Sequence, residues 1–451
     1  MRKKALITTI PVEHIALTAR VERRGVPTRT PEECFAAANN IEYINGFTLP
    51  NYATRFLKAN VPSLHVLEYP TWDEYRRALS SGEFDVVGIS FWTYTAPEAL
   101  TMAKLAREAG VREVWGGGHG VSTPGISSHF DRVFKSYSEY EIKPLLEEEE
   151  LTSFRHPVLE SKYDFHLGDT PTGYLFSVRG CGYQCTFCSG PRYYERQAVT
   201  PVEEVERILD AYRGKGIRHV TVVDETFFQK PRHARQVIAA LKARHLTFTC
   251  TSRVDVLLKH LDELKEYGLR NVYIGIESMD DRSLASVHKG VQSRITEALL
   301  RRLEAYGSFA FGTYMLCLEN DTIESIRRSV EKLNAFPALY GVVFWIATPF
   351  PGTEFYDRLE AAGEISDRDP KHYDALHLVQ HHPYISPTQA RELLFDCVKK
   401  HCHPQNIRKA KVLRKWRDME RAGTTPQISG TLPIDARVLD ATKPQEAKEL
   451  R

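Results

Sequence analysis

Short apolar segments alternate with amphipathic segments along most of the chain, and this alternation constrains the fold more than any other feature. Short apolar runs are typical of buried parallel strands. The first set of runs covers 4–10, 64–69, 84–90, 113–116 and 132–136, with helical patterns over 52–59, 72–79 and 96–109. Strands alternating with helices predict a doubly wound, Rossmann-like α/β domain over residues 1–148. Residues 11–49 match no single element.

A second set of strand and helix patterns follows from residue 173. Apolar runs cover 174–179, 219–224, 246–252, 271–276, 309–317 and 341–346, and helical patterns cover 202–212, 232–243, 256–267, 295–306 and 323–333. Six strand and helix units are too few for an eightfold barrel. They predict a partial (β/α)6 barrel over residues 173–365, with its active site at the carboxyl ends of the strands.

The remaining segments lack this alternation. The acidic run Glu147 to Glu150 and the polar stretch after it predict a linker over 149–172. Two helices, near 387–402 and 405–421, predict a small helical region over 366–421. The polar composition of 422–451 predicts a tail without regular structure.

Bulk composition excludes several classes of protein. The 451 residues carry 60 Lys and Arg against 58 Asp and Glu, a net charge of +2, so we expect no nucleic-acid partner. No apolar stretch reaches the roughly 18 residues of a membrane span, and the run from Ala5 to Ile10 is too short for a signal peptide. A cytoplasmic protein without a membrane span is expected.

Three of the eight cysteines, Cys181, Cys185 and Cys188, form a CxxxCxxC triad. Three thiolates can ligate three irons of a [4Fe–4S] cube and leave the fourth iron open for chemistry. A zinc site needs a paired CxxC or additional His, and a purely structural cluster needs a fourth Cys. Neither is evident nearby, which favours the open cluster. The scattered cysteines read as ordinary thiols: Cys34, Cys250, Cys317, Cys397 and Cys402.

The segment RGCGYQCTFCS, from Arg179 to Ser189, resembles the signature loop of radical S-adenosylmethionine (SAM) enzymes, including the aromatic Phe187 before the last cysteine. The resemblance implies that SAM chelates the open iron and that an electron from the cluster releases a 5′-deoxyadenosyl radical. The cofactors then carry the chemistry. No residue of the chain is assigned a catalytic role.

Several positions at later strand ends match SAM contacts of that family. Asp224 and Glu225 match a contact to the SAM amino group, with an acidic helix start as the alternative. Glu277 matches a position that reaches the ribose or methionine, with a structural ion pair as the alternative. Arg253 is a candidate partner for a carboxylate of SAM or substrate. Residues 348–353 resemble the PFPGT loop of radical SAM proteins with an additional N-terminal domain.

The first domain has candidate ligand contacts at its strand ends, where doubly wound sheets bind ligands. Hydroxyls lie at Ser90 and Thr93, and Gly116, Gly117, Gly118 and His119 form a glycine turn. With Pro124 and the segment 130–141, this order resembles the cobalamin-binding domain of B12-dependent radical SAM enzymes. The alternative, a dinucleotide site, lacks a GxGxxG after the first strand.

Two departures from that domain are evident. The DxHxxG motif, which supplies a cobalt ligand in cobalamin mutases, is missing, although this class commonly leaves the lower axial position without His. The GEGE-like element reads Ser136-Tyr-Ser-Glu-Tyr-Glu141 and loses both glycines.

We interpret His119 as a hydrogen-bonding residue. The histidines near 377–403 are interpreted as surface or substrate-pocket residues, and the basic run 408–417 as a solvated amphipathic helix.

The leading hypothesis is a cobalamin-dependent radical SAM methyltransferase that acts on an unactivated carbon of a small-molecule or lipid-like substrate. The resemblance implies that one SAM methylates cobalt and a second supplies the radical. An electron donor such as flavodoxin or ferredoxin is implied. The runner-up is oxidative cyclisation or rearrangement with the same cofactors. A cobalamin or cluster sensor without turnover is a more distant alternative. A tRNA methylthiotransferase is disfavoured because only Cys34 lies in the first domain.

Overall fold

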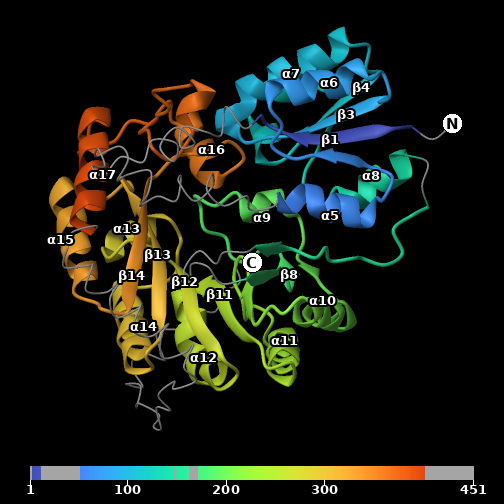
Figure 1. The fold of residues 1–451 in the computed structure, drawn as a ribbon. Coiled ribbons are helices and arrows are strands. Elements are labelled where there is room, and N and C mark those ends of the chain that lie inside the picture. The colour runs from blue at the N-terminus through green and yellow to red at the C-terminus, as the bar shows by residue number, and fades with distance from the viewer. Residues whose placement is uncertain (1–2, 12–50, 147–148, 162–170, 402–451) are drawn as a thin grey trace, which may run out of the picture.

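The computed structural model describes residues 3–11, 51–146, 149–161 and 171–401. Figure 1 shows an N-terminal α/β unit packed against the open end of a barrel-like sheet. The expectations for 12–50, for the second C-terminal helix and for the tail fall outside the described residues, as do Cys34 and Cys402.

The N-terminal unit is a five-stranded parallel sheet in the order β2-β1-β3-β4-β5. Each of its predicted strands is present: β1 (Ala5–Thr9), β2 (His65–Leu67), β3 (Val86–Ser90), β4 (Glu113–Gly117) and β5 (Arg132–Phe134). Side chains alternate between the two faces. Leu6 and Val87 pack against α6 (Trp72–Ser80) and α7 (Ala96–Glu108). Ile7 and Trp115 pack against α5 (Tyr52–Asn60) and α8 (Glu139–Leu145). The sheet is therefore doubly wound.

The second unit is a sheet with the order β14-β13-β12-β11-β10-β7-β6. Six strands run parallel: β7 (Thr172–Leu175), β10 (His219–Val222), β11 (Thr247–Arg253), β12 (Leu269–Glu277), β13 (Phe309–Leu316) and β14 (Leu339–Ile346). Helices cover the outside (Figure 1): α10 (Val202–Gly214), α11 (Pro231–Ala243), α12 (Val254–Glu266), α14 (Ser293–Ala305) and α15 (Ile323–Asn334). The sheet stays open, so this unit is a partial barrel, as the six predicted strands suggested.

The structure differs from the expectation where the chain enters the barrel. The strand expected over 174–179 ends at Leu175, and β8 (Val178–Arg179) leaves the barrel to pair antiparallel with β9 (Ala198–Val199). This exit carries the cysteine segment across the barrel mouth. Part of the expected linker, β6 (Glu160–Ser161), pairs antiparallel with β7. Three short helices give too little periodicity to be predicted: α9 (Gly190–Tyr193), α13 (Asp281–Ser286) and α16 (Glu354–Ala361).

The C-terminal helix α17 (Pro387–His401) covers the edge of the barrel, close to its predicted position. Leu393, Leu394 and Val398 are almost fully buried in the barrel core. They pack beside α15 and the edge strand β14 (Figure 1). A covered edge strand is protected from pairing with other chains, so α17 completes the open side of the sheet.

A buried cation joins the two units. The Arg179 guanidinium, on β8, lies 2.5 Å from Oε1 of Glu139 on α8, and the two side chains are 11% and 3% exposed. The rings of Phe56, Tyr137 and Phe154 surround the guanidinium, at 4.7, 4.4 and 4.5 Å from their centroids. The Tyr137 hydroxyl also donates to the Arg179 carbonyl, at 2.7 Å. Arg179 therefore fixes the N-terminal unit against the start of the cysteine segment.

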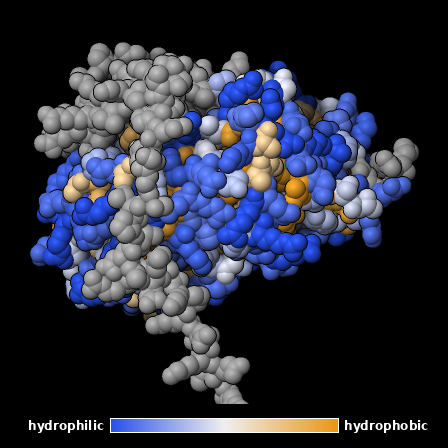
Figure 2. Space-filling model, turned by 90° about the horizontal axis from the view of Figure 1, so that it is seen from below, coloured by the Kyte–Doolittle hydropathy of each residue, from blue (hydrophilic) through white to orange (hydrophobic). Residues whose placement is uncertain are grey.

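One described face of the molecule is mainly polar. On the face shown in Figure 2, hydrophilic side chains predominate and the hydrophobic ones are scattered among them. In the described ranges, no helix has the length and apolar character that crossing a membrane requires.

Removing the partner of the buried cation should destabilise the protein. Glu139→Ala leaves Arg179 buried without its carboxylate, and breaking a buried pair in this way costs about 3 to 5 kcal/mol. We expect the urea midpoint of Glu139→Ala to fall accordingly, whereas Glu141→Ala, two residues along α8 at an exposed position, should match the wild type. Equal midpoints for the two variants would contradict the role assigned to Arg179.

Candidate active site

A cavity of about 540 Å³ opens at the carboxyl ends of the barrel strands. Seven residues expected at the SAM and cluster site line it: Cys181, Cys185, Phe187, Cys188, Glu225, Arg253 and Glu277. They come from the cysteine segment and from the ends of three different strands. The barrel therefore brings together side chains that are separated by up to about a hundred residues along the chain.

Backbone amides of the cysteine segment donate hydrogen bonds to residues that follow β10 and α13. The Gly180 amide donates to Oε2 of Glu225 at 2.9 Å, and the Thr186 amide donates to the Val287 carbonyl at 3.2 Å. Two side chains reach the sulfur atoms. Thr226 Oγ1 lies 3.6 Å from the Cys181 Sγ, and Arg253 Nη1 donates to the Cys185 Sγ at 3.6 Å.

The chemistry of the three thiols fits a cluster better than a single ion. All three are free, and burial raises the pKa of the Cys188 thiol to about 11 and raises that of Cys185. Such thiols ionise readily only against a bound cation. Within the described ranges, no three His, Cys, Asp or Glu side chains converge on one metal position. A cluster that takes one thiolate per iron does not require that convergence, whereas zinc does.

Asp224 does not line the cavity, whereas Glu225, the other carboxylate expected to contact the SAM amino group, does. Its carboxylate is 1% exposed and accepts two hydrogen bonds from Ser177, from the amide at 2.7 Å and from Oγ at 2.6 Å. Burial raises its pKa to about 7. Neighbouring residues of a strand end point to opposite sides, so only Glu225 faces the cavity. Asp224 instead ties the end of β10 to the end of β7.

Glu277 forms an ion pair, which is the alternative role expected for it, with a partner that the sequence did not indicate. Lys289 Nζ lies 2.9 Å from Glu277 Oε1, and both side chains are less than a tenth exposed. A Cβ at Gly275 would lie 2.3 Å from that oxygen, so glycine makes room for the pair. Glu277 itself has φ +62°, a strained conformation for a non-glycine residue and typical of functional sites. Lys289 follows a short helix in a loop, where no motif marks it.

Arg253 is not a free cation at the cavity wall. Its Nε lies 3.1 Å from Asp255 Oδ1, and its Nη2 donates to the Lys289 carbonyl at 2.5 Å. Its guanidinium also lies 3.9 Å from the centroid of the Tyr183 ring. Asp255 and Tyr183, which the sequence interpretation missed, are both close to recognised residues in sequence.

A second cavity, of about 140 Å³, lies at the carboxyl edge of the N-terminal sheet. Of the candidate cobalamin contacts, four line it (Ser90, Gly116, Gly117 and Gly118), whereas Thr93 and His119 do not. Thr93 is buried in the turn after β3. This cavity and the barrel cavity share two wall residues, Tyr52 from α5 and Glu225 from the barrel. No sequence motif marks Tyr52, because its place in both walls depends on how the two units pack.

Two glycines of the glycine turn differ in what a side chain would meet. Gly118 has φ +85°, and a Cβ there would lie 2.6 Å from the Phe91 carbonyl oxygen. A Cβ at Gly117 would meet only the Ile89 carbonyl, at 4.0 Å, so this residue leaves the cavity open. Ser136, at the start of the acidic element, lines the same cavity and has φ +60°.

His119 is packed between aromatic rings from both units. Its imidazole stacks on Trp92, with centroids 4.8 Å apart, and on Tyr193 of α9, with centroids 3.9 Å apart. Burial lowers its pKa to about 4, so the ring is neutral near pH 7. Its place between two rings, away from the cavity wall, gives it a packing role.

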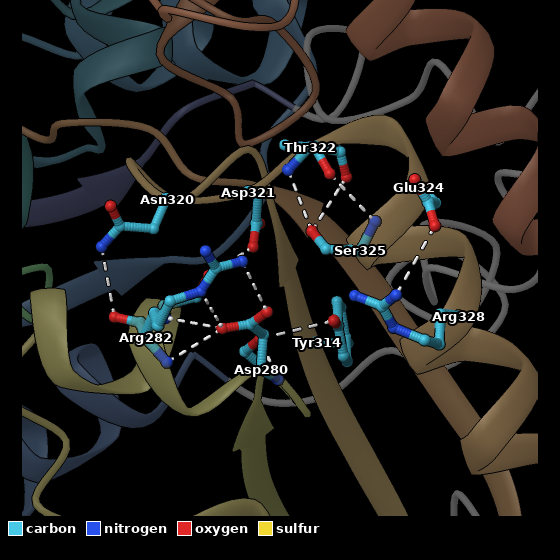
Figure 3. A network of polar contacts seen from close by, with 11 residues as sticks. Asp280, Arg282, Tyr314, Asn320, Asp321, Thr322, Glu324, Ser325 and Arg328 are labelled. Carbon is cyan, nitrogen blue, oxygen red and sulfur yellow. Dashed lines mark hydrogen bonds and ion pairs between the residues drawn. The ribbon is translucent and has the colours of Figure 1, made fainter.

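A separate polar network ties the loops after β12 and β13 together (Figure 3). Asp321 accepts from Ser283 Oγ at 2.5 Å and from the Leu318 amide at 3.0 Å. Burial raises its pKa to about 7. Asp280 accepts from the Arg282 amide at 2.9 Å and caps α13. The side chains of this network do not line the barrel cavity. Their hydrogen bonds hold the two loops at the mouth of the barrel together.

The described part of the histidine-rich region shows local pairing. His377 Nδ1 lies 2.9 Å from an oxygen of Asp374, which raises the pKa of His377, and His382 Nε2 lies 2.9 Å from the Leu318 carbonyl.

Part of the chain matches a known protein family, and much of it is similar to known methyltransferases. Residues 175–333 match the Radical SAM superfamily. An uncharacterized methyltransferase of Pyrococcus horikoshii is 23% identical over 407 residues, which cover 78% of this chain and 88% of that protein. The bacteriochlorophyllide d C-8(2)-methyltransferase of Chlorobaculum tepidum is 23% identical over 361 residues, 72% of this chain and 79% of the other.

One solved structure has a similar fold over nearly the whole chain. It is the radical SAM methyltransferase TsrM of Kitasatospora setae, with cobalamin and a [4Fe–4S] cluster bound. The TM-score is 0.62 at 14% identity, with 93% of this chain and all of that chain covered. Together these similarities confirm the family resemblance that the sequence indicated and the expectation of an enzyme.

The stacked histidine should make stability depend on pH. The pKa of His119 is about 4 in the folded protein and about 6.5 when unfolded. The unfolded chain therefore binds more protons in this window, so the stability present above pH ~6.5 is lost as the pH falls towards 4. His119→Phe keeps a ring between Trp92 and Tyr193 but cannot titrate. We expect its melting temperature to fall less than that of the wild type between pH 7 and pH 4.5. Parallel curves would show that His119 does not contribute.

Proposed function

Starting from the radical SAM domain at residues 175–333, we propose that this enzyme is a cobalamin-dependent methyltransferase acting on an unactivated carbon of a small-molecule or lipid-like substrate. One observation carries the proposal. The cavity with the three cysteines and the cavity with the glycine turn share Tyr52 and Glu225. A ligand in each would face the other across these two side chains.

The residues present fit both groups. Cys181, Cys185 and Cys188 would hold a [4Fe–4S] cluster whose fourth iron is left for SAM. Glu225 and Glu277 are the carboxylates that face the same cavity and would bind polar groups of SAM. When bound, the cluster and SAM supply a carbon-centred radical, and cobalamin supplies a methyl group.

The N-terminal residues would hold cobalamin by close contact with its edge. Ser90 offers a hydroxyl, and Gly117 leaves space that any side chain would fill. In the described ranges, the cavity wall there offers no histidine. We therefore infer that no described residue of this wall acts as a lower axial imidazole ligand, which is in keeping with the missing DxHxxG motif.

The rest of the barrel cavity indicates how the chain would handle a substrate. Its deeper wall is formed by aromatic rings and hydroxyls: Tyr174, Thr221, Thr251, Tyr273, Phe311, Thr313 and Trp345. The two cations that line the barrel cavity, Arg253 and Lys289, are each paired with a carboxylate. Aromatic rings exclude water from a radical, and uncharged hydroxyls orient a substrate without placing a charge beside it. This supports a substrate whose reacting part is apolar.

The cluster assignment predicts SAM cleavage that depends on the triad. Anaerobically reconstituted protein with reductant, SAM and cobalamin should form 5′-deoxyadenosine. Cys185→Ala should reduce the rate at least about a hundredfold, because removing an iron ligand disrupts the cluster. Cys397→Ala changes a buried cysteine of α17 that does not line the cavity, and it serves as the control. Liquid chromatography with mass spectrometry measures the product, and undiminished formation in Cys185→Ala would refute the cluster.

The label from the SAM methyl group separates methyl transfer from the alternatives. With SAM deuterated in its methyl group, a methyltransferase yields a metabolite that carries the three deuterons. A cyclase or rearrangement enzyme forms 5′-deoxyadenosine without a labelled product, and a sensor forms neither. An unlabelled product would rule out methyl transfer and favour cyclisation or rearrangement.

The cobalamin assignment predicts that Gly117 is needed for retention. Gly117→Leu places a branched side chain in the second cavity, and overfilling of this size costs about 1 to 3 kcal/mol. We therefore expect cobalamin affinity, measured by equilibrium dialysis with absorbance, to fall about tenfold or more. Iron content and melting temperature serve as internal controls and should stay unchanged. Unaltered cobalamin affinity would show that cobalamin does not bind in the second cavity.

A further inference from the structure

We propose that Arg253 is a positioning residue that sets the reduction potential of the cluster through the thiolate of Cys185. This inference rests on the proposed function only in assuming that a [4Fe–4S] cluster occupies the cysteine triad. It replaces the expected role of Arg253 as a partner for a carboxylate of SAM or substrate.

The contacts of Arg253 fix its guanidinium beside the sulfur. Nη1 donates to the Cys185 Sγ at 3.6 Å, and Nη2 donates to the Lys289 carbonyl at 2.5 Å. The ring of Tyr183, two residues before Cys185, stacks on the guanidinium at 3.9 Å. Arg253 is 6% exposed and stands immediately before α12, as its N-cap residue. A side chain held on three sides in this way keeps its donor on the sulfur.

A donor at a cluster thiolate favours the reduced cluster. Reduction adds one electron from an external low-potential donor to the cluster, and no bond breaks. The extra negative charge spreads over the sulfur atoms, where a charge-assisted hydrogen bond stabilises it. Hydrogen bonds to the sulfurs are among the features that set cluster potentials. Arg253 therefore raises the potential relative to a cluster without this donor.

Asp255 opposes that effect. Its carboxylate oxygens lie 3.1 and 3.4 Å from Nε and Nη2 of Arg253, and its side chain is 19% exposed. At this burial, its negative charge is only partly screened and offsets much of the guanidinium charge that the cluster experiences. Arg253 and Asp255 thus form a pair whose two members act on the cluster with opposite sign.

The two variants should shift the midpoint potential of the cluster in opposite directions, and a loss of structure cannot produce that result. Midpoint potentials of the reconstituted cluster would be measured by redox titration with electron paramagnetic resonance, without SAM, cobalamin or substrate. Arg253→Gln removes the charge, and we expect a shift to a more negative potential. Asp255→Asn keeps a side chain of the same shape without its charge, and we expect a shift to a less negative potential. Arg253→Lys, which keeps the charge without the fork, should fall between wild type and Arg253→Gln.

The control is Arg235→Gln, which removes an arginine of the exposed ion pair with Glu263 on the outer helices. It should leave the potential unchanged. Unshifted potentials in both Arg253→Gln and Asp255→Asn, at full iron content, would overturn the inference, and so would shifts of the same sign. If Arg253→Gln does not fold, Asp255→Asn alone still decides by the sign of its shift. Failure of the wild type to bind iron is a different result, since it would refute the cluster.

Discussion

The buried ion pair between Arg179 and Glu139 is the interaction on which the rest of the site depends. It joins α8 of the N-terminal unit to the residue from which the cysteine segment starts, and three aromatic rings shield it from water. A buried charge is stable only with such a partner, so the two units have one favourable arrangement. In that arrangement Tyr52 and Glu225 form a wall common to both cavities. The closeness of the two cavities is thus a result of packing between domains.

Charge in the barrel cavity is confined to the cysteine end. Glu277 pairs with Lys289 and Arg253 with Asp255, whereas the deeper wall is aromatic and hydroxyl-bearing. This separation suits two tasks that need different surroundings. A cluster and the polar groups of SAM need fixed charges and donors, and a carbon radical needs a dry, apolar wall. The strained backbone at Glu277 and the missing side chain at Gly275 show that the chain adapts locally to hold the charged end together.

Much of the fold could be predicted from the sequence, because strands and helices follow hydrophobic periodicity. The triad, Glu225 and Glu277 line one cavity, because strand ends meet at one edge of the sheet. Asp224 was placed in that cavity wrongly, because adjacent residues point apart and the pattern does not show which one faces inward. Lys289, Tyr52 and Asp255 were missed. Lys289 lies in a loop, Tyr52 reaches the site through domain packing, and Asp255 is connected to the site by its ion pair with Arg253.

In the proposed function, the cluster and cobalamin sit close enough to act on one substrate. Electron paramagnetic resonance tests it directly on protein that holds cob(II)alamin and the reduced cluster together. Both centres are then paramagnetic, and the account predicts that each broadens or splits the signal of the other. A spectrum equal to the sum of the two centres measured separately would contradict it.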